Sequence, residues 1–194
     1  MQTRTLSILV ENRPWSLTRI AALLSRRGFA VDSLAVGPSE RPELARVTVV
    51  VDSARQPVAQ IAAQLDKLVD VREAVPLDPD LAVRRELVLV KVAVAGAAAQ
   101  ARVAEILRLF HASTEQVGAD AVVVQAVGTA AELASLLALL DEFGVREVVR
   151  SGAVALEGCV APAGAGAGRP GAGRLQRAGA SRAGTGMESA RWSS

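Results

Sequence analysis

The chain has 194 residues, enough for one large or two small domains. Half of the residues are apolar, and the aromatic ones are three Phe and two Trp, with no Tyr. Five of its 22 basic residues but only one of its 20 acidic residues lie in 161–194, so the rest of the chain has two more acids than bases. The alkaline isoelectric point therefore does not indicate a folded part that binds nucleic acid, and no apolar run approaches the ~18 residues that span a bilayer.

The first 76 residues predict the order β-α-β-β-α-β. Apolar residues alternate from Leu6 to Val10, as in a strand, and then recur from Leu17 to Leu24 at the spacing of an amphipathic helix, which Gly28 ends. The expected elements are strands near 6–10, 30–36, 45–51 and 69–75, and helices with apolar stripes at 17–24 and 58–65.

The same order resumes after the linker-like run 76–80, which is rich in Pro and Asp. Thr129 and Glu132 have the spacing of a capping box, which predicts a helix start, and Gly144 predicts its end. The expected elements are strands at 86–94, 113–117, 121–127 and 145–156, and helices with stripes at 103–110 and 133–140.

This repetition predicts an α+β chain with two tandem ferredoxin-like βαββαβ domains. Their expected bounds are 1–76 and 84–158, with a linker at 77–83 and a disordered tail rich in Gly, Ala and Arg at 159–194. Each sheet would carry both helices on one face and leave an edge strand free. We therefore expect a homodimer.

Residues suited to catalysis are scarce. The only histidine, His111, is predicted at a helix end with no nucleophile near it, and the single Cys159 excludes an internal disulfide and a multi-cysteine metal site. No metal-ligand spacing or phosphate-binding loop occurs. The central strands have no aromatic residue on which an RNA base could stack, and Lys91 is their only cation in the runs VTVVV and LVLVKV. We expect no enzyme activity, no metal and a cytoplasmic location, since the N-terminus lacks the pattern of a secretory signal.

The turn at 11–16 is the best candidate for a binding site. It follows the first strand and opens the first helix, where unpaired backbone N–H groups point outward and can hold a carboxylate. This turn predicts a pocket for a small anion that is bound but not chemically changed.

The sequence at 6–40, 65–71, 85–92 and 150–152 resembles the small regulatory subunit of acetolactate synthase (acetohydroxyacid synthase). The resemblance covers about residues 4–157 in order. It implies an N-terminal ACT domain, which pairs with a second copy, and a second ferredoxin-like domain. It also implies a catalytic large subunit as partner, which carries the thiamine diphosphate, Mg and FAD, so that this chain itself holds no cofactor.

In that family valine is the feedback effector and binds between two ACT domains, held by the turn after the first strand and by the start of the partner's second strand. The resemblance therefore implies effector contacts in this chain at Asn12, Pro14, Trp15, Ser16, Leu17, Ala30 and Val31.

Two of these positions depart from the family pattern. Trp15 stands where the family has glycine, and Ala30 stands where it has asparagine. An indole could fill the space that a glycine leaves for a ligand, and the loss of an asparagine removes a hydrogen bond. We expect a weakened or lost valine response, although Trp15 could instead be an ordinary surface residue. Two other functions remain open: a free-standing amino-acid-sensing module for another enzyme, and nucleic-acid contact through the arginine-rich tail.

Overall fold

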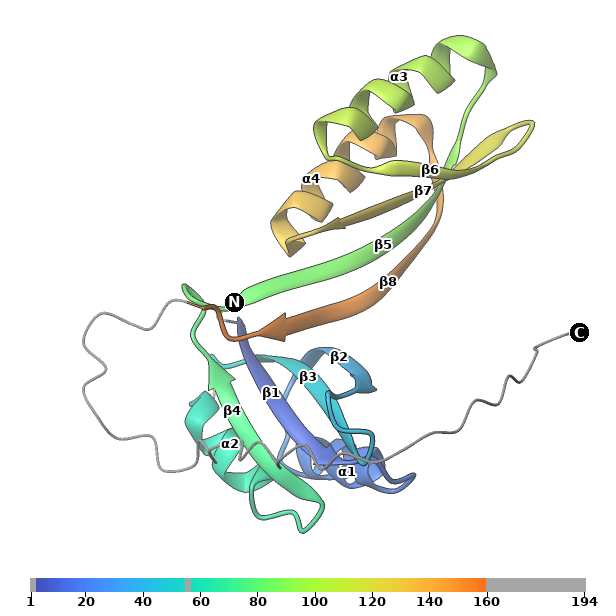
Figure 1. The fold of residues 1–194 in the computed structure, drawn as a ribbon. Coiled ribbons are helices and arrows are strands. Elements are labelled where there is room, and N and C mark those ends of the chain that lie inside the picture. Colours follow the sequence, from blue (N-terminus) through green and yellow to red (C-terminus); the bar gives the residue numbers. More distant parts are fainter. Residues whose placement is uncertain (1–2, 55–56, 160–194) are drawn as a thin grey trace, which may run out of the picture. The chain divides into compact units, whose positions relative to one another are not determined.

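The computed structural model describes residues 3–54 and 57–159, which form two successive β-α-β-β-α-β units (Figure 1). Each unit has a four-stranded sheet, with the strand orders β2-β3-β1-β4 and β6-β7-β5-β8. The predicted fold class is confirmed. The predicted disordered tail starts at 159, and its residues 160–194 lie outside the described part. No helix in 3–54 or 57–159 is long and apolar enough to cross a membrane.

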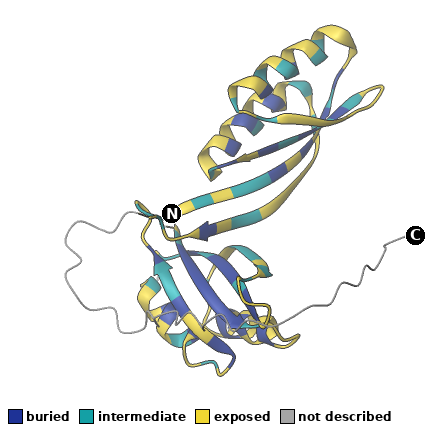
Figure 2. Cartoon of the chain, in the orientation of Figure 1, coloured by how far each residue is buried: buried dark blue, intermediate teal, exposed yellow. Residues whose placement is uncertain are grey.

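The first unit follows the sequence periodicity closely. Leu6, Ile8 and Val10 on β1 face the helices and are buried, and the first core closes with Ile20 and Leu24 from α1 (Figure 2). Its elements are β1 (Thr3–Glu11), α1 (Ser16–Arg26), β2 (Val31–Pro38), β3 (Leu44–Asp52), α2 (Val58–Leu65) and β4 (Val71–Leu77).

The last strand of this unit differs from the prediction. It was expected at 69–75, but β4 runs through Pro76, which pairs with Leu6. β4 is an edge strand of its sheet, and an edge position tolerates a residue without a backbone N–H. Pairing with β1 therefore extends β4 into a run that composition alone marks as a linker.

The second unit packs a separate core beneath its own helices. Val88 and Val90 from β5 are fully buried, together with Leu136 and Leu140 from α4. The elements are β5 (Val83–Ala93), α3 (Gly96–Leu109), β6 (Ser113–Val117), β7 (Ala121–Gly128), α4 (Ala130–Leu140), a 3-10 turn at Asp141–Phe143 and β8 (Val145–Leu156).

Helix ends agree with the sequence signals. Gly28 (φ 69°) ends α1, where the N–H of Phe29 donates to the carbonyl of Leu24 at 3.0 Å. His111 (φ 51°) takes the equivalent left-handed position after α3, so the only histidine of the chain is a helix-ending residue.

The predicted capping box at the start of α4 is present. The hydroxyl of Thr129 accepts a hydrogen bond from the Glu132 amide, and the Glu132 carboxylate accepts one from the Thr129 amide at 2.7 Å. The Thr129 backbone hydrogen bond is the largest cause of the lowered pKa of Glu132, because it favours the charged carboxylate.

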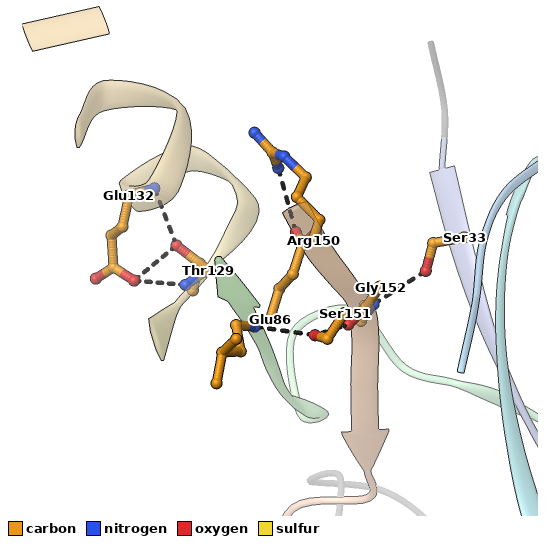
Figure 3. A network of polar contacts seen from close by, with 9 residues as sticks. Ser33, Glu86, Thr129, Glu132, Arg150, Ser151 and Gly152 are labelled. Atoms are coloured by element: carbon orange, nitrogen blue, oxygen red, sulfur yellow. Dashed lines mark hydrogen bonds and ion pairs between the residues drawn. The ribbon is translucent and has the colours of Figure 1, made fainter. Parts of the chain in front are cut away.

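The first and last strands of the second unit also contact the first sheet. The Ala153 amide of β8 donates to Ser33 Oγ of β2 at 2.9 Å (Figure 3). Gly152 (φ 75°) lies beside the same serine, and a Cβ at this position would be 3.0 Å from Ser33 Oγ. The guanidinium of Arg84 on β5 reaches Thr5 Oγ1 on β1 at 3.4 Å. These contacts connect the two units through polar groups of strands β1, β2, β5 and β8.

Candidate functional site

The turn at 12–15 is held by backbone hydrogen bonds on both sides. The amide of Asn12 donates to the carbonyl of Glu43 at 2.8 Å, and the amide of Ser16 donates to the carbonyl of Arg13 at 3.1 Å. Glu11, at the end of β1, accepts from Arg72 Nε on β4 at 2.7 Å. The turn therefore has a fixed path although its side chains lie at the surface.

The side chains of the turn are available to a ligand. Asn12, Pro14 and Trp15 are exposed. Within the described residues, Asn12 Nδ2 reaches the Pro42 carbonyl at 3.5 Å, which is the far limit for a hydrogen bond. No side chain among the described residues caps the start of α1, and its first turn has no acidic residue. A negatively charged group can thus approach the positive end of this helix.

Trp15 adopts a conformation that needs no glycine. Its φ of −88° and ψ of −13° are right-handed helical values, so the indole is present without backbone strain. The side chain is 48% exposed, and the Arg13 guanidinium lies 5.9 Å from its ring centroid. The tryptophan covers the outside of the turn and takes up space that a glycine would leave open.

Ser16 differs from its neighbours because it is buried. It is 2% exposed, and its Oγ has no hydrogen-bond partner among the described residues. Three residues after Ser16, Arg19 forms an ion pair with Asp70, with 3.0 Å between Nη1 and Oδ2. This Asp70 oxygen is also buried, and the ion pair does not have the geometry of a hydrogen bond. An unpaired buried hydroxyl costs free energy, so a ligand that reached Ser16 would gain from pairing it.

The other two predicted effector residues lie at the opposite end of the same sheet. Val31 pairs with Val51, which pairs with Arg4 near the start of β1, whereas the turn follows Glu11 at its end. Seven residues of strand separate these two levels, which is about 23 Å. One chain therefore does not bring Ala30 and Val31 to its own turn.

The catalytic candidates do not come together. Among residues 3–54 and 57–159, no group of three His, Cys, Asp or Glu side chains is placed to hold a metal ion. His111 lies at the end of α3, and Cys159 is exposed beyond β8. Two hydroxyls do lie beside carboxylates, Ser113 beside Glu115 at 2.7 Å and Thr129 beside Glu132 at 2.8 Å, but the first pair is on an exposed strand and the second is the helix cap of α4.

Family models match both units separately. The model for the acetohydroxyacid synthase small-subunit-like ACT domain matches residues 6–73, and the model for the small subunit of acetolactate synthase matches residues 85–158. The acetolactate synthase small subunit of Mycobacterium bovis is 44% identical over 155 residues, which cover 80% of this chain and 92% of that protein. The chain belongs to the acetolactate synthase small-subunit family.

Two more distant proteins agree with this assignment. The probable acetolactate synthase small subunit of Methanothermobacter thermautotrophicus is 35% identical over 79% of this chain and 92% of its own length. The crystal structure of the acetolactate synthase small subunit from Thermotoga maritima is 30% identical, covers 81% of this chain and 98% of its own, and has a TM-score of 0.74. The chain is thus similar to acetolactate synthase small subunits over both of its units and is a regulatory rather than a catalytic protein.

Sequence reasoning located the turn but missed the residues that support it. Arg72 binds Glu11 across 61 positions, and Asp70 pairs with Arg19 at the foot of α1. Neither pairing has a local sequence signal, because arginines and acids are common on surfaces and only the strand register brings these together. The effector roles of residues 12, 14–17, 30 and 31 stay predictions.

Proposed function

We propose that this chain is a non-catalytic subunit that binds and activates an acetolactate synthase large subunit in branched-chain amino-acid synthesis in the cytoplasm. The observation that carries this proposal is the family match, which extends over both units in order. The thiamine diphosphate, Mg and FAD of the reaction would belong to the large subunit.

An apolar sheet face supports a role as a subunit. Leu89, Val127 and Val149 lie on neighbouring strands of the second sheet, on the face away from its helices, and are 36%, 54% and 53% exposed. Adjacent exposed apolar side chains of this kind are typical of a surface that contacts another protein.

The effector site would be shared between two copies of the chain. β2 is an edge strand and leaves one side of its backbone unpaired within the described part of the chain. Two copies that pair β2 with β2 in opposite directions would bring Val31 of one copy to the end of the sheet where the other has its turn. Such a homodimer would complete a site that one chain leaves in two parts.

The valine response of this site would be weakened or lost. Trp15 occupies the outside of the turn, and Ala30 offers no side-chain hydrogen bond. One missing hydrogen bond is worth about 0.5–1.5 kcal/mol, or roughly 1.5–3 kcal/mol to a charged partner, which lowers affinity about tenfold or more in the second case.

The test is reconstitution with the large subunit of the same organism. The small subunit should co-purify with the large subunit and raise its activity, and valine, leucine and isoleucine should be titrated against that activity. Wild-type complex should be inhibited weakly, and the double variant Trp15→Gly, Ala30→Asn should regain inhibition by valine. The variant Val69→Asn, at an exposed position in the same unit, serves as control and should behave as wild type.

Three results would contradict these proposals. Failure to co-purify would favour a free-standing sensor for another enzyme. Ordinary micromolar valine binding by the wild-type chain would refute the weakened response. A purely monomeric chain in sedimentation equilibrium would refute the shared site.

A further inference from the structure

A cavity of about 400 Å³ lies where the second unit meets the first sheet, away from the turn described above. Its volume is that of a small-metabolite site. One wall comes from the starts of β1 and β2 and from β3, and the other comes from β5, β8 and the start of α4. The lining residues that carry a charge are Asp32, Arg84, Arg85, Glu86 and Arg150.

The lining has three arginines and two acids, and only one of these arginines, Arg150, forms an ion pair within the described part of the chain. Arg150 Nη1 lies 3.4 Å from Glu86 Oε2, so this pair is neutral overall. Arg85 Nη1 donates to the Arg84 carbonyl at 2.7 Å, and Arg84 Nη1 reaches Thr5 Oγ1 at 3.4 Å. Neither Arg84 nor Arg85 forms an ion pair among residues 3–54 and 57–159, although the charge of Arg85 contributes to the lowered pKa of the Glu132 carboxyl group.

The start of α4 adds to the positive potential of the cavity. Gly128, Thr129 and Ala130 are part of the wall, so the positive end of the helix dipole lies beside the arginines. The Glu132 carboxylate, in the capping box, offsets part of that potential (Figure 3). Of the two acids in the lining, Asp32 forms no ion pair within the described residues. Its single negative charge is smaller than the combined positive charge of Arg84 and Arg85.

We propose that this cavity binds a small oxyanion, the phosphate or carboxylate group of a metabolite, with Arg84 and Arg85 as its charged partners. Guanidinium groups present several N–H donors in one plane and bind both oxyanions through paired hydrogen bonds. A ligand here would touch both units, since the lining residues come from both. The site would be distinct from the effector turn at 12–15 and does not depend on the proposed function.

The test uses the full chain without any large subunit. Isothermal titration calorimetry with sodium pyrophosphate in one arm and sodium malonate in the other, at constant ionic strength, should show saturable binding in at least one arm. Binding in the first arm only identifies a phosphate site, and binding in the second only identifies a carboxylate site. No saturable binding in either arm would overturn the proposal.

Arg85→Gln should weaken the binding about ten- to a hundredfold, because it removes a charge-assisted interaction. The control Arg146→Gln makes the same charge change on β8, where the guanidinium pairs with Asp120 Oδ2 at 2.8 Å and does not line the cavity. This control should bind as the wild type does. Equal weakening in both variants would show a general charge effect and overturn the proposal.

A second variant keeps the test decisive if Arg85→Gln fails to fold. Ala130→Asp places a negative charge on the cavity wall. An acidic residue in the first turn of α4 also interacts favourably with the helix dipole, so the variant should fold. Binding should be lost by charge repulsion, with circular dichroism unchanged. Unaltered binding in this folded variant would place the anion elsewhere and refute the site.

Discussion

The two units share one topology and the same pattern of core packing but differ in the connection that follows the first strand. In the first unit, a turn with exposed Asn12, Pro14 and Trp15 leads into α1. In the second unit, β5 leads through two short apolar residues to Gly96, which has a φ of 81° and begins α3. Core packing constrains which residues the strands and helices can have. The residues of a connection at the surface can differ between the units without disturbing the packing of either core.

Their open sheet faces differ in the same way. On the first sheet, Thr5, Ser7 and Thr48 are small, polar and buried, and Ser7 accepts from Arg46 Nη1 at 3.0 Å. On the second sheet, the exposed side chains at the same kind of position include Leu89 and Val149, which lie next to the ion pair of Lys91 and Glu147. A repeated fold therefore provides one unit suited to polar contacts and another that presents apolar surface.

The largest effect should come from opening the second core. Leu136 is fully buried, and Leu136→Ala should lower the free energy of unfolding by about 2–5 kcal/mol. Leu139→Ala, on the exposed side of the same helix, is the matched control and should cost far less. Because the two cores are separate clusters, hydrogen exchange should speed up in β5 and β7. An equal acceleration in β1 and β3 would show that the units unfold together.

The contact between the units can be tested at two glycines. Gly28 and Gly152 both have positive φ, so alanine at either position should cost about 1–2 kcal/mol from backbone strain. A Cβ at Gly28 has no neighbour within 4 Å, whereas one at Gly152 would press on Ser33 Oγ. Gly152→Ala should therefore be the more destabilising change in chemical denaturation. Equal effects would mean that the serine moves aside freely.

A smaller effect should come from the capping box, which α4 has and α1 lacks. Thr129→Ala should lower stability by about 0.5–2 kcal/mol, as the loss of an N-cap does in other proteins. Thr18→Ala, in the first turns of α1 and outside any capping box, is the control and should change the denaturation midpoint little.

The same capping box predicts that the free energy of unfolding depends on pH. The pKa of Glu132 is lowered in the folded chain, so the unfolded state binds its proton more readily. Its contribution is present above the ordinary pKa of 4.5 and is lost as the pH falls through the lower folded value. The stability difference between wild type and Glu132→Gln should therefore shrink in acid. A difference that stays constant from pH 7 to acid would contradict this account.

Much of this fold could be predicted because its signals are local. The strand at 145–156 was expected with the bounds that β8 has, and Thr129 and Glu132 identified the start of α4. β5 was placed too late, at 86–94. Arg84 and Arg85 have no strand pattern of their own, and only pairing with Ala155 and Val154 of β8 draws them into the sheet.

The sequence by itself determined the two repeated units, their helix ends and the turn at 12–15, because alternation, helical stripes, glycines and caps act over a few residues. Only the tertiary structure decided that Val31 lies about 23 Å from the level of the turn, that Ser16 is buried without a partner, and that Arg84 and Arg85 line a cavity. Each of these depends on strand register and on the packing of residues far apart in the chain, which no local pattern records.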